Sequence, residues 1–133
     1  MATENTKGIR IAALVIRYLM GLIFFVFGLN GFLNFLPQPE LTAEGQTFMG
    51  GLFAAGYFFP LLKGIEVVAG ALLLSGFYVP LAIALLGPIT LNIFLMHVAI
   101  EPAGIPMAIF VFFGNLFLAY AYRDHYKAIF AKK

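Results

Sequence analysis

The chain contains no cysteine and little charge, and each shortage narrows what the protein can be. Without cysteine there can be no disulfide, no thiol redox chemistry and no metal or iron–sulfur cluster held by thiolates. Charged residues make up 11% of the 133 positions and hydrophobic residues 62%. A soluble domain carries roughly 25% charge, so most of this surface would have no water-compatible cover. The composition therefore predicts a single domain that uses lipid as its solvent.

The few basic residues gather near the two ends of the chain. Seven of the eight lie there, namely Lys7, Arg10, Arg17, Arg123, Lys127, Lys132 and Lys133. A nucleic-acid-binding domain usually presents its cations on one face, so nucleic acid is not expected as a partner. Basic residues that flank apolar spans follow the positive-inside rule instead. We therefore expect both termini to lie in the cytoplasm.

The apolar stretches between these ends predict an all-α, membrane-spanning four-helix bundle that forms one domain over residues 1–133. The predicted spans cover about residues 11–35, 59–74, 81–100 and 107–122. Residues 47–56 precede the second span and contain several glycines, which predicts a short interfacial or re-entrant helix. The uncharged run at residues 18–36 is longer than a signal-peptide core of about 7–15 residues, so we interpret it as a retained span.

Small residues mark one face of each of the first two spans. Gly21 and Gly28 share a face of the first span, and Ala69 and Gly70 thin one side of the second. Small side chains let helices approach closely in lipid, where no hydrophobic force drives their association. We therefore interpret these residues as packing contacts and not as a phosphate-binding loop.

Polar side chains inside the predicted spans are the candidates for a functional site, because lipid rejects them unless they find partners. They are Asn30 and Asn34 in the first span, Lys63 and Glu66 in the second, and Asn92 and His97 in the third, with Glu101 directly after it. Given the expected topology, all of them lie toward the outer face. Random placement would divide them between the two halves of the membrane, so their shared depth predicts one polar pocket near that face.

Glu66 is the strongest candidate, because an acidic side chain within a span costs about 2.5–3.5 kcal/mol on insertion scales. It could carry a proton or hold a polar head group; alternatively, it pairs with Lys63 and only stabilises its helix. A histidine can titrate near neutral pH, so His97 could exchange protons with Glu66 or Glu101; alternatively, it caps the end of its helix or bonds Glu101. The asparagines could bind a ligand, although hydrogen bonds between helices are their more common role.

No cofactor is predicted directly by a motif. His97 and Glu101 supply only two metal ligands, and the second histidine, His125, lies at the opposite side, so no metal site is expected. No G-x-G-x-x-G opens a helix after a strand, and two histidines are few for haem ligation. A quinone tail or a lipid could pack against the phenylalanine-rich stretches, although phenylalanine alone does not indicate either ligand.

Much of the chain resembles the DoxX-like family of small four-helix bacterial membrane proteins. The resemblance is carried by PLLKGIEVVAGALLLSGFYVPLAIALLGPITLNIFLMHV, which places Lys63 and Glu66 in a K-x-x-E context and ends in P-I-x-x-N-I-x-x-x-H. GLIFFVFGLNGFLNF fits the first span of the family, and AYRDHYKAIF fits its end. The positions that match are Lys63, Glu66, Asn92 and His97. The resemblance implies a protein of the bacterial cytoplasmic (inner) membrane, related to a subunit associated with a thiosulfate:quinone oxidoreductase.

Three functional classes remain open at this point. The leading expectation is a non-catalytic accessory subunit of a membrane redox or assembly complex, whose pocket holds a quinone, a lipid or a partner helix. The second is a component of a quinone-linked oxidoreductase in which Glu66 or His97 moves protons, although the lack of cysteine argues against direct thiol–quinone chemistry. The third is a small proton or solute transporter. The expected partners are the lipid bilayer and other membrane subunits or further copies of the chain.

Overall fold

The computed structural model describes residues 3–132, which form helices and no strand. The helices are α1 (Thr3–Leu33), α2 (Ala43–Ala54), α3 (Phe58–Ser75), α4 (Val79–Ala99) and α5 (Ile105–Ala121), with short 3₁₀ turns η1 (Pro102–Gly104) and η2 (Arg123–Tyr126). Four segments are long and apolar enough to cross a membrane, namely Lys7–Leu33, Phe58–Ser75, Val79–Ala99 and Pro102–Ala121. The predicted fold class is confirmed, and the chain is a multi-pass membrane protein.

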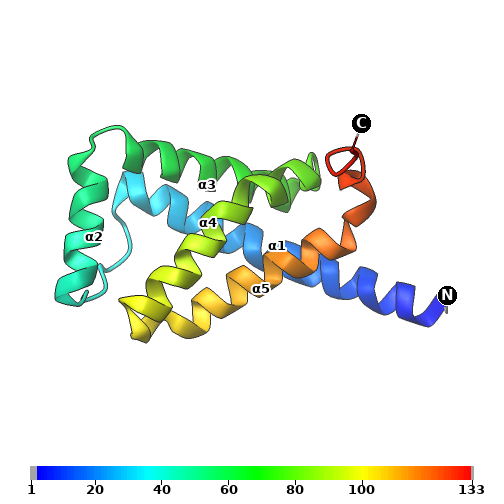
Figure 1. Cartoon of the computed structure of the whole chain (residues 1–133), viewed down its shortest axis with the longest axis horizontal. Helices are drawn as coiled ribbons and strands as arrows, with labels where there is room; N and C mark the ends of the chain where they lie inside the picture. Colours follow the sequence, from blue (N-terminus) through cyan, green and yellow to red (C-terminus); the bar gives the residue numbers. More distant parts are fainter. Residues whose placement is uncertain (1–2, 133) are drawn as a thin grey trace.

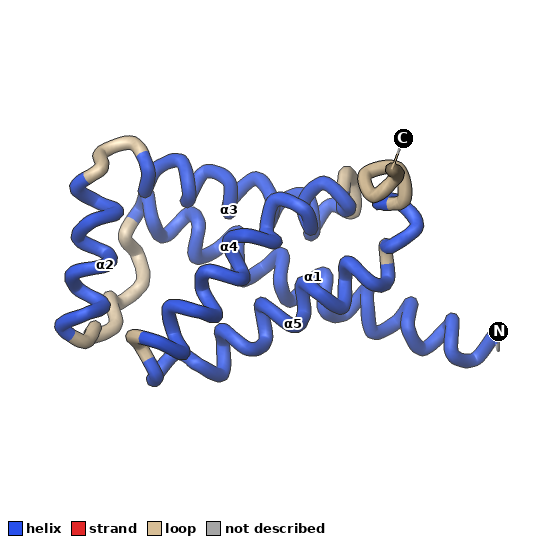
Figure 2. Tube along the Cα trace, in the orientation of Figure 1, coloured by secondary structure: helices blue, strands red, loops and turns tan. Residues whose placement is uncertain are grey.

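The four long helices form two pairs (Figures 1 and 2). The most extensive contacts join α1 with α3 and α4 with α5. Both ends of the described chain lie at one end of the bundle, which we call the terminal end. Helix α2 runs across the direction of α1 and α3 at the opposite end, which we call the α2 end.

Helix α2 begins earlier than the predicted residues 47–56, because Thr42 caps it. The hydroxyl of Thr42 accepts a hydrogen bond from the N–H of Gly45 at 3.0 Å, which satisfies one of the free donors of the first turn. Gly50 and Gly51 lie inside the helix, as predicted, with open space around them.

The close approach of α1 and α3 depends on glycine. A Cβ atom added to Gly70 would lie 2.5 Å from the backbone nitrogen of Phe25, and one added to Gly28 would lie 2.9 Å from that of Val67. Real Cβ atoms do not approach backbone so closely, so any side chain here would push the helices apart. Lipid gives helices no hydrophobic reason to associate, and close backbone packing replaces that force.

The substitution Gly70→Ala tests this contact. It should lower the free energy of unfolding by about 1–3 kcal/mol, because its clash is with backbone that cannot turn aside. Gly64→Ala is the matched control in the same helix, since a Cβ at Gly64 meets nothing within 4 Å. Unfolding by sodium dodecyl sulfate in mixed micelles, followed by circular dichroism, measures both. Equal stability of the two variants would contradict the close contact.

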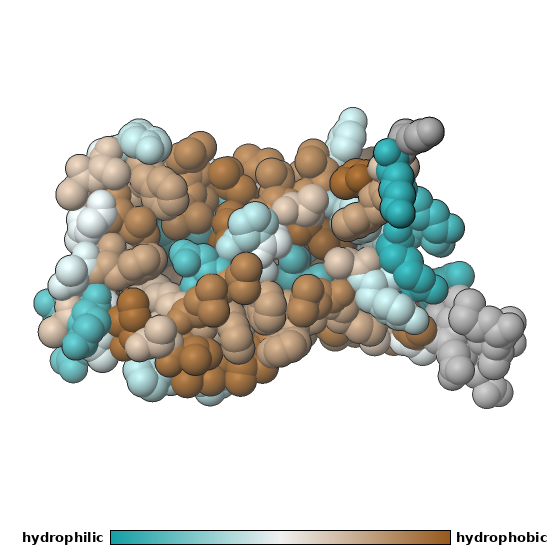
Figure 3. All heavy atoms as spheres, viewed as in Figure 1, coloured by the Kyte–Doolittle hydropathy of each residue, from teal (hydrophilic) through white to brown (hydrophobic). Residues whose placement is uncertain are grey.

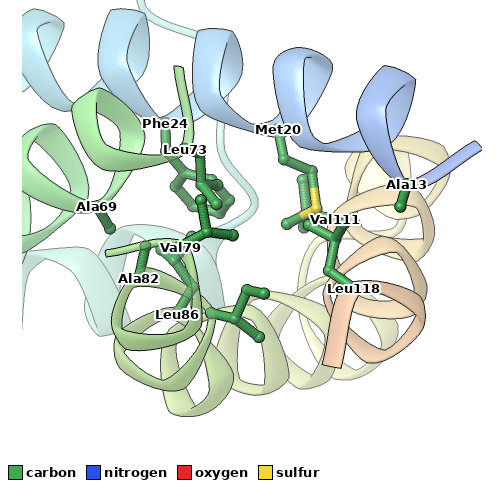
Figure 4. Packing of buried hydrophobic residues seen from close by; sticks show 11 residues of the cluster. Ala13, Met20, Phe24, Ala69, Leu73, Val79, Ala82, Leu86, Val111 and Leu118 are labelled. Carbon is green, nitrogen blue, oxygen red and sulfur yellow. The ribbon is translucent and has the colours of Figure 1, made fainter. Parts of the chain in front are cut away.

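A tightly packed hydrophobic core fills the middle of the bundle. Figure 4 shows Met20 from α1, Leu73 from α3, Leu86 from α4 and Leu118 from α5 gathered in this core, and each of these side chains is fully buried. Full burial of side chains of this size leaves little room for water in this region. The polar candidates from the sequence lie outside this core, toward the α2 end.

The outside of the bundle is apolar. Large side chains such as Leu33, Val68 and Phe113 are more than half exposed, at 66%, 53% and 52%. Figure 3 shows the result, a body that is mostly hydrophobic with hydrophilic atoms at its two ends. Apolar patches of this extent are not stable in water, and the hydrocarbon of a bilayer is the solvent that covers them.

Tyr126 fastens the C-terminal segment to the start of α4. Its hydroxyl donates a hydrogen bond to the carbonyl of Pro80 at 2.7 Å. Burial of the phenol, together with the neighbouring Tyr122, raises the pKa of Tyr126 to about 12. The hydrogen bond needs the protonated hydroxyl, so it is complete below the ordinary pKa of about 10 and is lost as the pH rises through about 12.

Tyr126→Phe should therefore cost about 0.5–1.5 kcal/mol of unfolding free energy at neutral pH. The difference from the wild type should vanish above pH 12, where the wild type has lost the same bond. Tyr120→Phe is the control, because Tyr120 is exposed and its hydroxyl forms no hydrogen bond among the described residues. A difference that persists unchanged at high pH would show that the Tyr126 hydroxyl does not act through its proton.

Candidate functional site

A cavity of about 370 Å³ lies in the half of the bundle nearest α2. Its walls come from all five helices and from the loop before α2. The polar residues of the lining are Gln38, Lys63, Glu66, Asn92 and His97. The other lining residues are Ile23, Phe24, Phe27, Pro39, Leu41, Phe48, Met49, Leu52, Phe59, Leu62, Ile93, Met96, Met107 and Val111. A few polar groups among apolar and aromatic walls are typical of small-molecule sites, which measure about 300–1,000 Å³.

Hydrophilic atoms are visible within the apolar side of the molecule. Figure 3 shows them recessed between α3 and α4, framed by hydrophobic atoms and separate from the hydrophilic atoms at the bundle ends. A polar recess in this position faces the lipid-covered side and not the water at either end. A ligand that enters here would therefore be one that dissolves in the membrane.

Lys63 and Glu66 form an ion pair inside this cavity. The Lys63 ammonium lies 3.3 Å from Oε1 of Glu66, and the two side chains are only 19% and 6% exposed. Their spacing of three residues places them as neighbours on α3. The stem of Lys63 packs directly over Gly31 of α1, where no Cβ would fit, and its ammonium lies 5.5 Å from the ring centre of Phe59.

The ion pair leaves hydrogen-bonding capacity unused. Within residues 3–132, Lys63 is the only group that donates a hydrogen bond to Glu66, and it does so to Oε1 alone. A lysine ammonium has three N–H groups, and a carboxylate accepts at both oxygens. The pair can therefore stabilise its own charges and still bind a polar group in the cavity. Pairing and ligand binding, which the sequence left as alternatives, are compatible in this geometry.

His97 occupies the same cavity, and its proton position follows from its partner. Nδ1 lies 2.8 Å from the carbonyl oxygen of Ile93, so Nδ1 carries the proton that is donated to that carbonyl. Nε2 is then the nitrogen that can accept a proton. The ring packs against Gly104, where a Cβ would overlap it. His97 therefore neither bonds Glu101 nor caps a free carbonyl at the very end of α4.

The structure brings four of the seven predicted site residues together and places three elsewhere. Lys63, Glu66, Asn92 and His97 line the cavity, whereas Asn30, Asn34 and Glu101 do not. The polar lining within the spans thus comes from α3 and α4, and α1 contributes apolar walls. The remaining three residues have structural roles at the ends of helices α1 and α2.

Asn30 and Asn34 terminate α1. The side-chain oxygen of Asn30 accepts a hydrogen bond from the backbone of Leu36 at 2.7 Å. Asn34 adopts a left-handed conformation with φ of 53° and donates its backbone N–H to the carbonyl of Asn30. Asparagine tolerates this conformation better than most residues, and left-handed residues commonly end helices. The side chain of Asn30 and the backbone of Asn34 therefore shape the turn that leads to α2.

Glu101 lies outside α4 and holds the start of α2. Its Oε1 accepts hydrogen bonds from the backbone N–H of Thr42 at 2.5 Å and from the hydroxyl of Thr42 at 2.8 Å. The side chain is 5% exposed and packs against Gly45, where no Cβ would fit. The carboxylate thus sits at the positive end of α2. By fixing α2, it positions Phe48, Met49 and Leu52 over the cavity.

Sequence reasoning missed the covering role of α2 and its anchor. Thr42 carries the signal that could have revealed the helix start, because threonine followed by Glu44 in the first turn is a common N-cap pattern. No sequence signal pairs Thr42 with Glu101, which lies 59 residues away. Gln38 was missed because it lies in a loop and not in an apolar span.

Metal binding has no support in the part of the chain that the structure describes. No three histidine, aspartate or glutamate side chains gather there in a way that could hold an ion. The Oε1 atom of Glu101 is occupied by Thr42, which leaves it poorly placed to act with His97.

Comparisons with protein-family models, with curated proteins and with solved structures found no match for this chain.

Glu101→Ala should loosen α2 without unfolding the bundle. The substitution removes the acceptor of two hydrogen bonds from Thr42, which should lower the free energy of unfolding by about 1–3 kcal/mol. The loss should be confined to α2, the helix that these bonds anchor. Hydrogen exchange followed by mass spectrometry should show faster exchange over residues 43–54 and unchanged exchange over α3. Glu40→Ala, which removes an equal charge from the exposed loop, should leave α2 as it is. Identical exchange in the two variants would rule out the anchor.

Proposed function

We propose that the protein is a DoxX-like accessory subunit of a membrane redox or assembly complex in the bacterial cytoplasmic membrane, and that its cavity binds the head group of a quinone. One observation carries this proposal: a single cavity combines the Lys63–Glu66 pair, Asn92 and His97 with apolar walls from all four spans. The DoxX-like resemblance of the same four residues supports it independently.

The lining suits an uncharged ring with polar oxygens. A quinone accepts hydrogen bonds at its carbonyl oxygens, and the free N–H groups of Lys63 and the amide of Asn92 can donate them. A quinol instead donates hydrogen bonds, which Oε2 of Glu66 and Nε2 of His97 can accept. The flat ring would pack against Phe27 and the other aromatic and methionine side chains of the walls.

The cavity also suits a ligand with a long apolar tail. Its hydrophilic recess faces the lipid side of the bundle, so a tail can remain in the membrane while the head group is bound. The apolar lining residues outnumber the polar ones. A small water-soluble solute would gain little binding free energy from contact with such apolar walls.

The distribution of charge supports an outward-facing cavity. The α2 end carries Glu40 and Glu44, and the connections there contain no basic residue. Basic residues gather at the terminal end. Under the positive-inside rule the terminal end is cytoplasmic, and the cavity then lies in the outer half of the membrane.

The packed core favours a binding role over transport. Met20, Leu73, Leu86 and Leu118 have no exposed surface and lie between the cavity and the terminal end. A proton or solute that crosses the protomer would need a polar path through these side chains. An accessory role needs no such path.

A short-chain benzoquinone is the probe for this function. The detergent-extracted protein should bind it about one to one, and Glu66→Gln and His97→Ala should each weaken binding by about tenfold, or 1.4 kcal/mol. Glu40→Gln is the control, since it changes an exposed carboxylate outside the cavity. Native mass spectrometry measures occupancy, and circular dichroism verifies that the helices are intact. Unchanged binding in both cavity variants would remove this cavity as the quinone site.

A further inference from the structure

A second cavity lies at the terminal end, and the proposed quinone site does not use it. It measures about 500 Å³ and lies between the start of α1 and the segment that follows α5. Two arginines from these distant segments, Arg10 and Arg123, share its lining. Ile9, Ala13, Leu14 and Ala121 provide its apolar surface.

The depth of this cavity matches the head-group level of a bilayer. Arg10 lies in the first turn of the span Lys7–Leu33, and Arg123 follows the end of the span Pro102–Ala121. Leu14 is 47% exposed, so the apolar wall continues directly into the lipid-facing surface of α1. A molecule that occupied the cavity could thus place a charged group between the arginines and an acyl chain along α1.

The guanidinium of Arg123 is held in place, but most of its N–H donors form no hydrogen bond with the described residues. One terminal N–H group donates to the carbonyl of Tyr120 at 2.9 Å, and the guanidinium carbon lies 4.4 Å above the ring of Tyr120. Guanidinium has five N–H donors, so most of them remain available. Planar, paired donors of this kind fit phosphate oxygens well, and a partly fixed side chain loses little entropy on binding.

The balance of charges around the cavity favours an anion. Asp124 is the acidic residue of the lining, and it pairs with Lys127 at 3.3 Å. Its negative charge is thus offset locally, whereas the cavity-lining guanidiniums of Arg10 and Arg123 have no acidic partner among the described residues. Two unpaired cations beside an apolar wall at the membrane surface are a pattern that attracts anionic lipid head groups.

We infer that this cavity, formed by Arg10 and Arg123 above the apolar side chains Ala13 and Leu14, binds the phosphate of an anionic phospholipid. The two arginines bind the phosphate group, and the exposed face of α1 receives an acyl chain. Because the ligand connects the start of α1 with the end of α5, it also ties the two ends of the chain together at the membrane surface.

Lipid titration of the full-length, delipidated protein tests the inference. The probes are phosphatidylglycerol, phosphatidylcholine with the same acyl chains, and inorganic phosphate, with bound species counted by native mass spectrometry. The wild type should bind phosphatidylglycerol in preference to both other probes. The double variant Arg10→Gln/Arg123→Gln should lose about tenfold or more of that affinity.

A matched control separates the site from general surface charge. Lys7→Gln/Lys132→Gln removes the same two charges from exposed positions outside the cavity lining and should cost clearly less affinity. Arg10→Lys/Arg123→Lys keeps the charge and loses the paired donors, so it should fall between the wild type and the glutamine variant. The four substituted residues, Lys7, Arg10, Arg123 and Lys132, all lie at exposed positions. Circular dichroism verifies that each variant is folded.

Two outcomes would overturn the inference. Equal loss of phosphatidylglycerol binding in the cavity variant and in the lysine control would show that only the overall charge of this end matters. Inorganic phosphate binding as tightly as phosphatidylglycerol would show that the site takes a free anion and that the apolar wall has no part in it.

Discussion

Hydrocarbon offers no hydrogen-bond partner, so polar side chains inside this bundle depend on partners within the protein. Thr90 donates to the carbonyl of Gly87, His97 to that of Ile93, and Asn115 of α5 to that of Ile83 in α4. Glu66 uses Lys63 in the same way. The first two bonds are local to α4, and the third joins two helices. These bonds lower the cost of holding the polar groups in the membrane, and the side-chain oxygen of Asn115 is a buried acceptor that has no partner among the described residues.

The cavity can bind a polar ligand because the side chains that line it have more donors and acceptors than their own hydrogen bonds use. Lys63 and Glu66 satisfy one another through a single contact, and both retain further hydrogen-bonding positions. In the middle of the bundle the small residues and fully buried side chains leave no comparable space, as the close contact of Gly70 with Phe25 shows. The middle of the bundle is therefore tightly packed, whereas the part beneath α2 is hollow. Ligand binding at the hollow part does not compete with the packing that holds the helices together.

Helix α2 gives the hollow part its outer wall, and it does so through few contacts. The carboxylate of Glu101 holds its first turn, and the rings of Phe53 and Phe59 meet at 4.2 Å near its last turn. Between these two points Phe48, Met49 and Leu52 face the cavity. A helix attached at its ends and apolar along one side can cover a ligand without adding a fifth span.

Sequence alone determined the four spans, the gathering of basic residues at the termini and four of the residues that line the cavity. These features are local, because hydropathy and helical spacing depend only on neighbouring residues. Tertiary structure decided the rest. Asn30, Asn34 and Glu101 have the same chemistry and nearly the same depth as the lining residues, yet their partners at Leu36 and Thr42 turn them into helix ends and an anchor. Those partners follow from where the chain turns and which segments meet, since the Thr42–Glu101 contact spans 59 residues. A pattern along one helix carries no record of such a contact, and for this reason only the folded chain could separate the ligand-facing polar groups from the structural ones.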